Sequence, residues 1–279
     1  RPRPRRPSPA ARPASCSNGS CETVRDVATR VRLSAGGLVL GPPGRAHGLV
    51  QEDQTTCGAT CVLAARLLYE RDGAAAARLR ALEHHGLRHA LLAEQQRLQA
   101  LMNRHARGPL GPLPWPRSLG STPWAVARAL EWAVPPPTGP VTYTVTWGSE
   151  RGPHWFTTVA RLRRHLAAGL PAILLAGGPV RAVRRTRAGA GGTVTPTSVV
   201  PAVLAGAERV LPALPRHYVL ALSWSLLGAV DPGPGSVHVY DPASGTVGVL
   251  DLVAPRDPEA PGPRELGHWP RVLAVVEPC

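Results

Sequence analysis

Apolar residues recur at helical spacing directly after a polar turn near residue 50. The stretch from Gln51 to Cys61 reads QEDQTTCGATC, and the apolar run VLAARLLY follows it. Apolar positions three and four residues apart predict a buried helix, which we expect to begin near Cys57 and to end near Arg71. Cys57 is therefore expected in the first turn of a core helix, and Cys61, one turn further on, is expected to be a core thiol.

Helical and strand patterns alternate along the rest of the chain. Leucines at helical spacing predict a second helical region from residue 74 to about residue 107, and Thr122-Pro123 is typical of a further helix start. Alternating β-branched and aromatic residues in VTYTVTW predict a strand, as do the apolar runs in AILLA, HYVLAL and SVHVYDP.

Two of these predicted strands carry a histidine and an aspartate. His217 opens HYVLAL, and Asp241 follows SVHVY. If the two strands form an antiparallel hairpin in which Ala221 pairs with Val237, His217 lies opposite Asp241 on the same face. We choose this register because it lets a carboxylate hold an imidazole. His238 has the opposite parity, so it is expected to point away.

The composition limits the other classes of function. The chain has 279 residues, 43% of them hydrophobic, which is enough for one sizeable core. All 32 basic residues are arginine, and with 32 Pro and 29 Gly this bias is typical of a GC-rich genome. The net charge of +14 is thus weak evidence for nucleic acid, and no zinc-finger spacing, aromatic RNA platform or basic zipper is present. No apolar stretch reaches the length of about eighteen residues that a membrane span needs.

Cysteine and histidine spacing bears on disulfides and metals. The cysteines number five, so at least one thiol is free or paired to another molecule. Cys16 and Cys21 lie in a polar loop that can close a small disulfide, which would favour an exported or cell-envelope protein of a bacterium. His85 and His89 are four residues apart but lack a third ligand. We therefore expect no metal and no other cofactor.

A cysteine at a helix start, followed by a histidine and an aspartate, supplies the parts of a thiol acyl-transfer site. Free N–H groups and the helix dipole stabilise a thiolate at Cys57. The thiolate would attack a carbonyl carbon, His217 would protonate the leaving amine, and Asp241 would orient the ring. The backbone N–H of Cys57 and a side-chain amide, from Gln51 or Gln54, would bind the oxyanion.

Several motifs, in this order, resemble the double-glycine (bacteriocin-processing) cysteine peptidases and their stand-alone relatives in the papain-like superfamily. They are Gln51 six residues before Cys57-Gly58, then GSTPWAVARALEWA, LRRHLAAGLPAILL, HYVLAL and VHVYDPASG. The resemblance covers roughly residues 49–252. It implies a papain-like α+β fold, in which a helical part with the catalytic cysteine packs on an antiparallel β-sheet.

The resemblance also implies the role of each residue. Cys57 would be the nucleophile, His217 the base, Asp241 the orienting carboxylate and Gln51 the oxyanion donor, since the six-residue spacing favours Gln51 over Gln54. The implied reaction is hydrolysis of peptide bonds, with a peptide or protein precursor cleaved at small residues such as glycine as substrate. Two alternatives stay open: a papain-fold acyltransferase, transglutaminase or deamidase with the same triad, and a non-catalytic papain-like module that binds peptides.

The domain organisation follows from the same motifs. We expect residues 1–48 to form an Arg/Pro-rich tail and N-terminal extension, and residues 49–279 to form the peptidase-like domain. A helical insertion at about 70–117 and a Gly/Arg-rich loop at 177–200 depart from the family's usual pattern. Insertions around a cleft change what fits in it, so the sequence leaves the substrate open. No ATP-binding motif is present.

Overall fold

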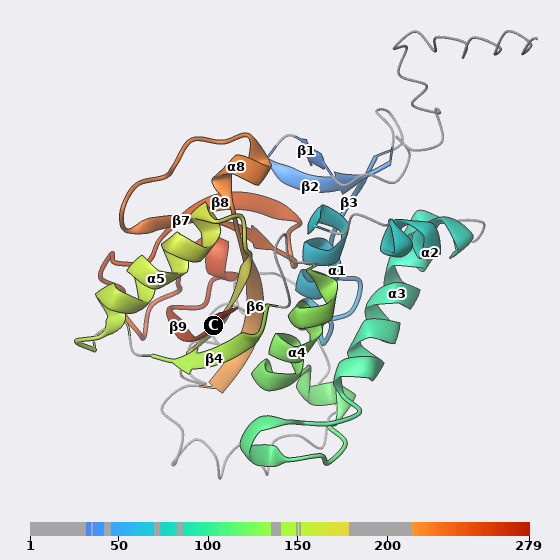
Figure 1. Cartoon of the computed structure of the whole chain (residues 1–279), viewed down its shortest axis with the longest axis horizontal. Helices are drawn as coiled ribbons and strands as arrows, with labels where there is room; N and C mark the ends of the chain where they lie inside the picture. The colour runs from blue at the N-terminus through green and yellow to red at the C-terminus, as the bar shows by residue number, and fades with distance from the viewer. Residues whose placement is uncertain are drawn as a thin grey trace, which may run out of the picture.

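The computed structural model describes residues 32–34, 36–41, 46–69, 73–82, 86–134, 141–148, 150, 152–178 and 214–279. The Arg/Pro-rich segment, the Cys16 and Cys21 pair, His85 and residues 179–200 of the Gly/Arg-rich loop lie outside these residues. The described chain combines helices with an antiparallel sheet, so it belongs to the α+β class (Figure 1).

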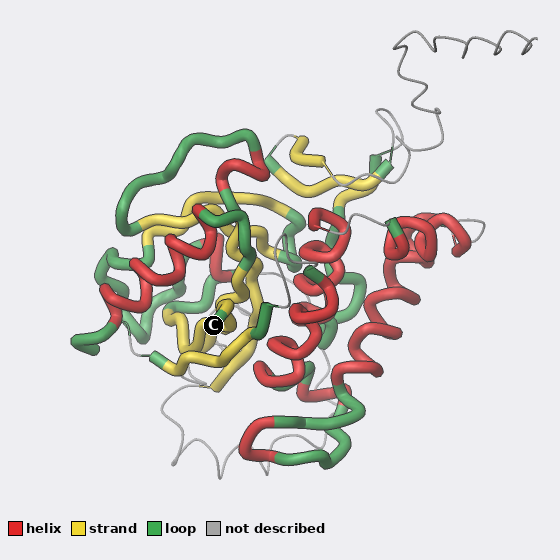
Figure 2. Tube along the Cα trace, in the orientation of Figure 1, coloured by secondary structure: helices red, strands yellow, loops and turns green. Residues whose placement is uncertain are grey.

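Most of the helices precede most of the strands. The helices of the described residues are α1 (Cys57–Tyr69), α2 (Ala74–Leu82), α3 (Leu87–Met102), α4 (Pro123–Ala133), α5 (Trp155–Ala167) and α8 (Trp224–Leu227), with 3-10 turns η3 (Gly108–Leu110), η4 (Arg117–Leu119) and η5 (Arg264–Leu266). Figure 2 shows α1 to α4 gathered on one side of the molecule, beside the strands. No helix in the described part of the chain is long and apolar enough to cross a membrane.

The described strands form one antiparallel sheet. They are β1 (Arg32–Ser34), β2 (Gly37–Leu40), β3 (His47–Gly48), β4 (Tyr143–Trp147), β5 (Ala172–Gly178), β6 (Leu214–Leu222), β7 (Ser236–Asp241), β8 (Thr246–Asp251) and β9 (Arg271–Pro278). Their order is β1-β2-β8-β7-β6-β5-β9-β4, and β3 pairs with β2. The strands that carry the histidine and the aspartate are thus neighbours near the middle of the sheet.

Residues 32–48, which the sequence assigned to the N-terminal extension, add three strands to this sheet. The backbone of β2 pairs with β8 through Gly37 and Thr246. Leu38 and Leu40 of β2 are buried in the main core. This part of the chain therefore packs with the residues that follow it.

The sheet separates two hydrophobic clusters. Alternate residues of β6 face opposite sides, so Tyr218 and Leu220 join the cluster with α1, α3 and α4, whereas Val219 and Ala221 join the cluster with α5. Both faces of β6 are buried by this arrangement. That explains why HYVLAL is almost entirely apolar.

The helix that begins at Cys57 packs very closely on β6. Its first nine residues are all buried. A Cβ atom on Gly58 would lie 3.1 Å from the ring of Tyr218 and 3.3 Å from Val126 of α4. Glycine at this position therefore lets the start of α1 approach the strand that carries His217.

The register between β6 and β7 differs from the predicted one. Ala221 pairs with Val239, where the sequence analysis chose Val237. A shift of two residues leaves every side chain on the same face. The alternation of apolar residues therefore does not distinguish the two registers. The predicted register was wrong by two residues.

Candidate active site

A tight turn leads into the helix that carries the candidate nucleophile. Asp53 accepts hydrogen bonds at Oδ1 from the N–H and the hydroxyl of Thr55, each at 2.8 Å. The bonds from Thr55 lower the pKa of this carboxyl group. The carbonyl oxygen of Asp53 accepts the hydroxyl of Thr56 at 2.7 Å. Cys57 follows as the first residue of α1 and is only 6% exposed.

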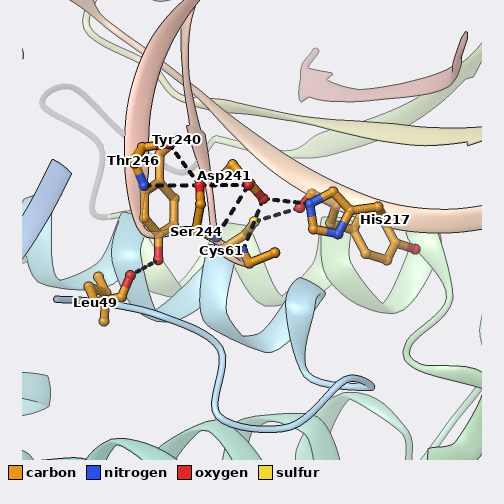
Figure 3. Close-up of polar contacts among 9 residues, drawn as sticks. Leu49, Cys61, His217, Tyr240, Asp241, Ser244 and Thr246 are labelled. Carbon is orange, nitrogen blue, oxygen red and sulfur yellow. Dashed lines mark hydrogen bonds and ion pairs between the residues drawn. The ribbon is translucent and has the colours of Figure 1, made fainter. Parts of the chain in front are cut away.

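The candidate histidine and aspartate meet directly. Nε2 of His217 lies 2.7 Å from Oδ1 of Asp241, and the two residues are 6% and 4% exposed (Figure 3). The aspartate also accepts the N–H of Ala243 at 3.0 Å and the hydroxyl of Ser244 at 2.7 Å. Burial raises the pKa of Asp241, but the bonds from His217 and Ser244 outweigh it and the pKa is lowered. The carboxylate is thus held in its charged form.

The imidazole interacts with both this carboxylate and the thiol. Asp241 and Cys57 each favour the charged form of the His217 ring. Burial lowers the pKa of His217, but the effects of Asp241 and Cys57 outweigh burial and raise the pKa from 6.5 to about 9. Since Nε2 donates to Asp241, Nδ1 is the nitrogen left to face the sulfur. Side chains from α1, β6 and β7 therefore come together at this imidazole.

The two candidate oxyanion donors occupy different environments. The N–H of Gln51 donates to the carbonyl oxygen of Pro242 at 2.7 Å, which ties the loop before α1 to the residue after Asp241. The side-chain Oε1 of Gln51 is buried and accepts no hydrogen bond from a described residue. Gln54 is exposed. Gln51 is thus anchored at the residue that follows Asp241, and among the described residues its side chain makes no hydrogen bond to Cys57.

The second cysteine of α1 lies in the core. Cys61 has no exposed surface, and its thiol donates to the carbonyl oxygen of Tyr218 at 3.5 Å. Burial raises the pKa of Cys61 well above its usual value. Cys61 is therefore held as a neutral thiol, as the sequence predicted for a core position.

The sequence analysis missed two polar residues that contact the loop before Cys57. Gln95 and Gln99 of α3 are completely buried and hydrogen-bond residues 50–56. The available signal was their spacing of four residues, in line with the buried Leu91 and Leu98. Polar side chains within an apolar stripe indicate buried hydrogen bonds.

A cavity lies away from the candidate site. It has a volume of about 660 Å³ and is bordered by β4, α5 and β9, with Thr144, Arg161, His165 and Glu277 among its lining residues. None of the four predicted site residues lines it. In the described part of the chain, no three His, Cys, Asp or Glu side chains gather as a metal site would require.

The arrangement has a defined chemical capability. A thiol at a helix start interacts with an imidazole, and a buried carboxylate binds Nε2 of that ring. Such a set can move a proton from the sulfur to the ring and on to a leaving group. No protein family, curated protein or solved structure matches this chain significantly.

Proposed function

We propose that this protein is a papain-like cysteine peptidase in which Cys57, His217 and Asp241 form the catalytic triad. The observation that carries the proposal is the 2.7 Å contact between His217 and Asp241, in a buried pair whose imidazole also interacts electrostatically with Cys57. Three distant segments supply these groups. A core that needed only packing would be more stable with apolar residues there, since buried charges are costly.

The proposed reaction begins with proton transfer. The thiol of Cys57 gives its proton to Nδ1 of His217, which leaves a thiolate and an imidazolium. The thiolate forms a C–S bond to the carbonyl carbon of the substrate, and the carbonyl oxygen takes the negative charge. Collapse of this intermediate breaks the C–N bond, and the imidazolium proton goes to the leaving amine. Water then gives a proton to His217 and attacks the thioester carbon. The C–S bond breaks, the carboxylic acid product leaves, and the sulfur receives the proton from His217.

Asp241 keeps the ring in the productive orientation. A carboxylate at Nε2 holds the proton on that nitrogen, so Nδ1 faces the sulfur. The oxyanion needs donors of its own. We assign this role to the backbone N–H of Cys57 and to the amide of Gln51, which is anchored at Pro242.

The resemblance to double-glycine peptidases extends the proposal to a substrate class. It favours a peptide or protein precursor that is cleaved at small residues such as glycine. A transferase or deamidase would form the same thioester with a different acyl donor or acceptor, and a binding module would form none. The experiments below separate these outcomes.

Alkylation at mildly acidic pH tests the thiolate. An ordinary thiol with a pKa near 8.5 is less than about 1% ionised at pH 6, so an ion-paired thiolate should react on the order of 100-fold faster with iodoacetamide. Mass spectrometry can follow each cysteine separately. The exposed Cys279 serves as the internal reference and the buried Cys61 as the unreactive one. Labelling of Cys57 no faster than that of Cys279 would contradict the proposal.

Product analysis tests the reaction type. The protein is incubated with a peptide pool that includes Gly-Gly sequences, with Cys57→Ala as the control. New peptide termini that depend on Cys57 support a peptidase. Ammonia release without new termini would instead identify a deamidase or transglutaminase, and retained peptide binding without any reaction would identify a binding module.

A further inference from the structure

Helix α3 buries two glutamines on the stripe that packs against the rest of the protein. Gln95 and Gln99 have no exposed surface, and they are one helical turn apart. A buried amide without hydrogen bonds costs about 1–3 kcal/mol, so a buried glutamine needs partners. Both side chains find them in the loop that precedes α1.

Gln95 holds the loop at three points. Its Nε2 donates to the carbonyl oxygen of Val50 at 2.7 Å. Its Oε1 accepts the N–H of Glu52 at 3.0 Å and the hydroxyl of Thr56 at 3.3 Å. The first two contacts flank Gln51, and the third reaches the residue immediately before the nucleophile.

Gln99 holds the end of the same loop. Its Nε2 donates to the carbonyl oxygen and the hydroxyl of Thr55, at 2.8 and 3.1 Å. Its Oε1 accepts Nε of Arg117 at 3.1 Å, and its Nε2 lies 3.3 Å from the carbonyl oxygen of Arg117. Gln99 thus joins the loop to η4.

We propose that Gln95 and Gln99 are positioning residues that hold residues 50–56 in the conformation in which Cys57 and Gln51 act. This inference rests on the proposed function. The loop has little regular structure of its own, so its backbone groups depend on these amides for partners. The helical insertion at about 70–117 would then help to hold the active site in place, in addition to any effect on which substrates fit.

The same helix offers a matched control for stability. Glu94 is 1% exposed, and it pairs with Arg78 of α2 and with Arg97 at 3.1 and 2.7 Å. None of these contacts involves the loop before α1. Glu94→Gln therefore weakens the packing of the insertion without changing the groups that hold the loop.

The test compares Gln95→Met and Gln99→Met with two controls on the same helix. One is Glu94→Gln, and the other is Gln96→Met, at a glutamine that is only half-buried. Methionine has a similar volume to glutamine and removes only the hydrogen bonds. We expect kcat to fall by about 10- to 100-fold in the first two variants, with KM changed by less than about threefold, because small misplacements of reacting groups have effects of this size. The alkylation rate of Cys57 at pH 6 should fall with kcat. Glu94→Gln should lower the melting temperature and leave kcat near the parent value, and Gln96→Met should change neither.

Two results would overturn the inference. One is a parent-like kcat and alkylation rate in the folded Gln95→Met and Gln99→Met variants. The other is a Glu94→Gln variant whose melting temperature and kcat both fall as much as those of the Gln95→Met and Gln99→Met variants. If a methionine variant does not fold, Gln99→Asn keeps the amide and shortens its reach, and the same loss is expected. Alkylation of the parent protein is measured before any variant is made. A parent protein whose Cys57 is not activated would contradict the proposed function itself.

Discussion

Gly267 lies directly against the imidazole of His217. A Cβ atom at position 267 would lie 2.8 Å from Cδ2 and 3.0 Å from Nε2 of that ring. The glycine follows η5 with a φ of 60°, in the left-handed region. Its missing side chain thus leaves the space in which the ring meets Asp241.

We predict that Gly267→Ala moves the His217 ring and lowers kcat/KM by about tenfold or more, because proton transfer depends on this geometry. Gly228 provides the matched control. It also follows a short helix, has a φ of 62°, and has no atom within 4 Å of a Cβ. Gly228→Ala should carry the same backbone strain and keep its activity. Equal activity in the two alanine variants would contradict the prediction.

Asp241→Asn should lower kcat/KM by about 10²- to 10⁴-fold, because an amide does not stabilise the imidazolium and can hold the wrong tautomer. Alkylation of Cys57 at pH 6 should then be slower. Peptide hydrolysis and the alkylation rate at pH 6 measure the two effects.

Asp251 is the control for Asp241. It also ends a strand, and its Oδ1 accepts the N–H groups of Val253 and Ala254 at 2.9 and 3.0 Å. Asp251→Asn should leave both measurements unchanged. A loss of activity as large as that of Asp241→Asn would show that the turn, and not the imidazole, explains the effect.

The His217–Asp241 pair should make stability depend on pH. The pKa of His217 is raised from 6.5 to about 9, so its contribution is complete below pH 6.5 and is lost as the pH rises through about 9. The pKa of Asp241 is lowered from 3.8, so its contribution is complete above pH 3.8 and is lost as the pH falls through the folded value. The pair should therefore stabilise the protein most between about pH 4 and pH 6.5.

Urea unfolding of the parent and of His217→Gln measures this dependence. The difference in free energy of unfolding should shrink between pH 6 and pH 10, by at most about 1.4 kcal/mol for each unit of pKa shift. His105→Gln is the control, because the exposed His105 contacts the carbonyl oxygen of Pro112. A difference that stays constant from pH 6 to pH 10 would contradict the raised pKa.

Gly58→Ala should destabilise the protein by about 1–2 kcal/mol, because the new Cβ meets the buried ring of Tyr218 and the buried Val126. The hydroxyl of Tyr218 donates to the carbonyl oxygen of Ser121 at 2.8 Å, so the ring has little room to shift. Gly48→Ala is the control, since its Cβ would meet one atom at 3.8 Å. An unchanged urea midpoint for Gly58→Ala would show that α1 has space to move.

Local pattern predicted the elements that carry the candidate site. The apolar run after Cys57 indicated a buried helix, and such a helix begins at this residue. The strands that hold His217 and Asp241 are adjacent, and the two side chains meet. These features depend on periodicity and short-range spacing, which one sequence contains.

The remaining features depend on contacts between distant parts of the chain. The strand register was wrong by two residues because either register puts the same side chains on the same faces. Strands β1 to β3 are too short and too rich in glycine to give a strand pattern. The spacing of Gln95 and Gln99 indicates burial, but the sequence does not show which loop they bind.

The place of β9 in the sheet has a consequence for the order of folding. This strand lies between β5 and β4 and pairs with both, although it follows them by about a hundred residues. Pairing across such separations makes folding slow. During synthesis, β4 and β5 must wait for residues 271–278, and so their unpaired edges are exposed to other chains. We therefore expect nascent chains to contain the helix with Cys57 well before they contain a completed sheet.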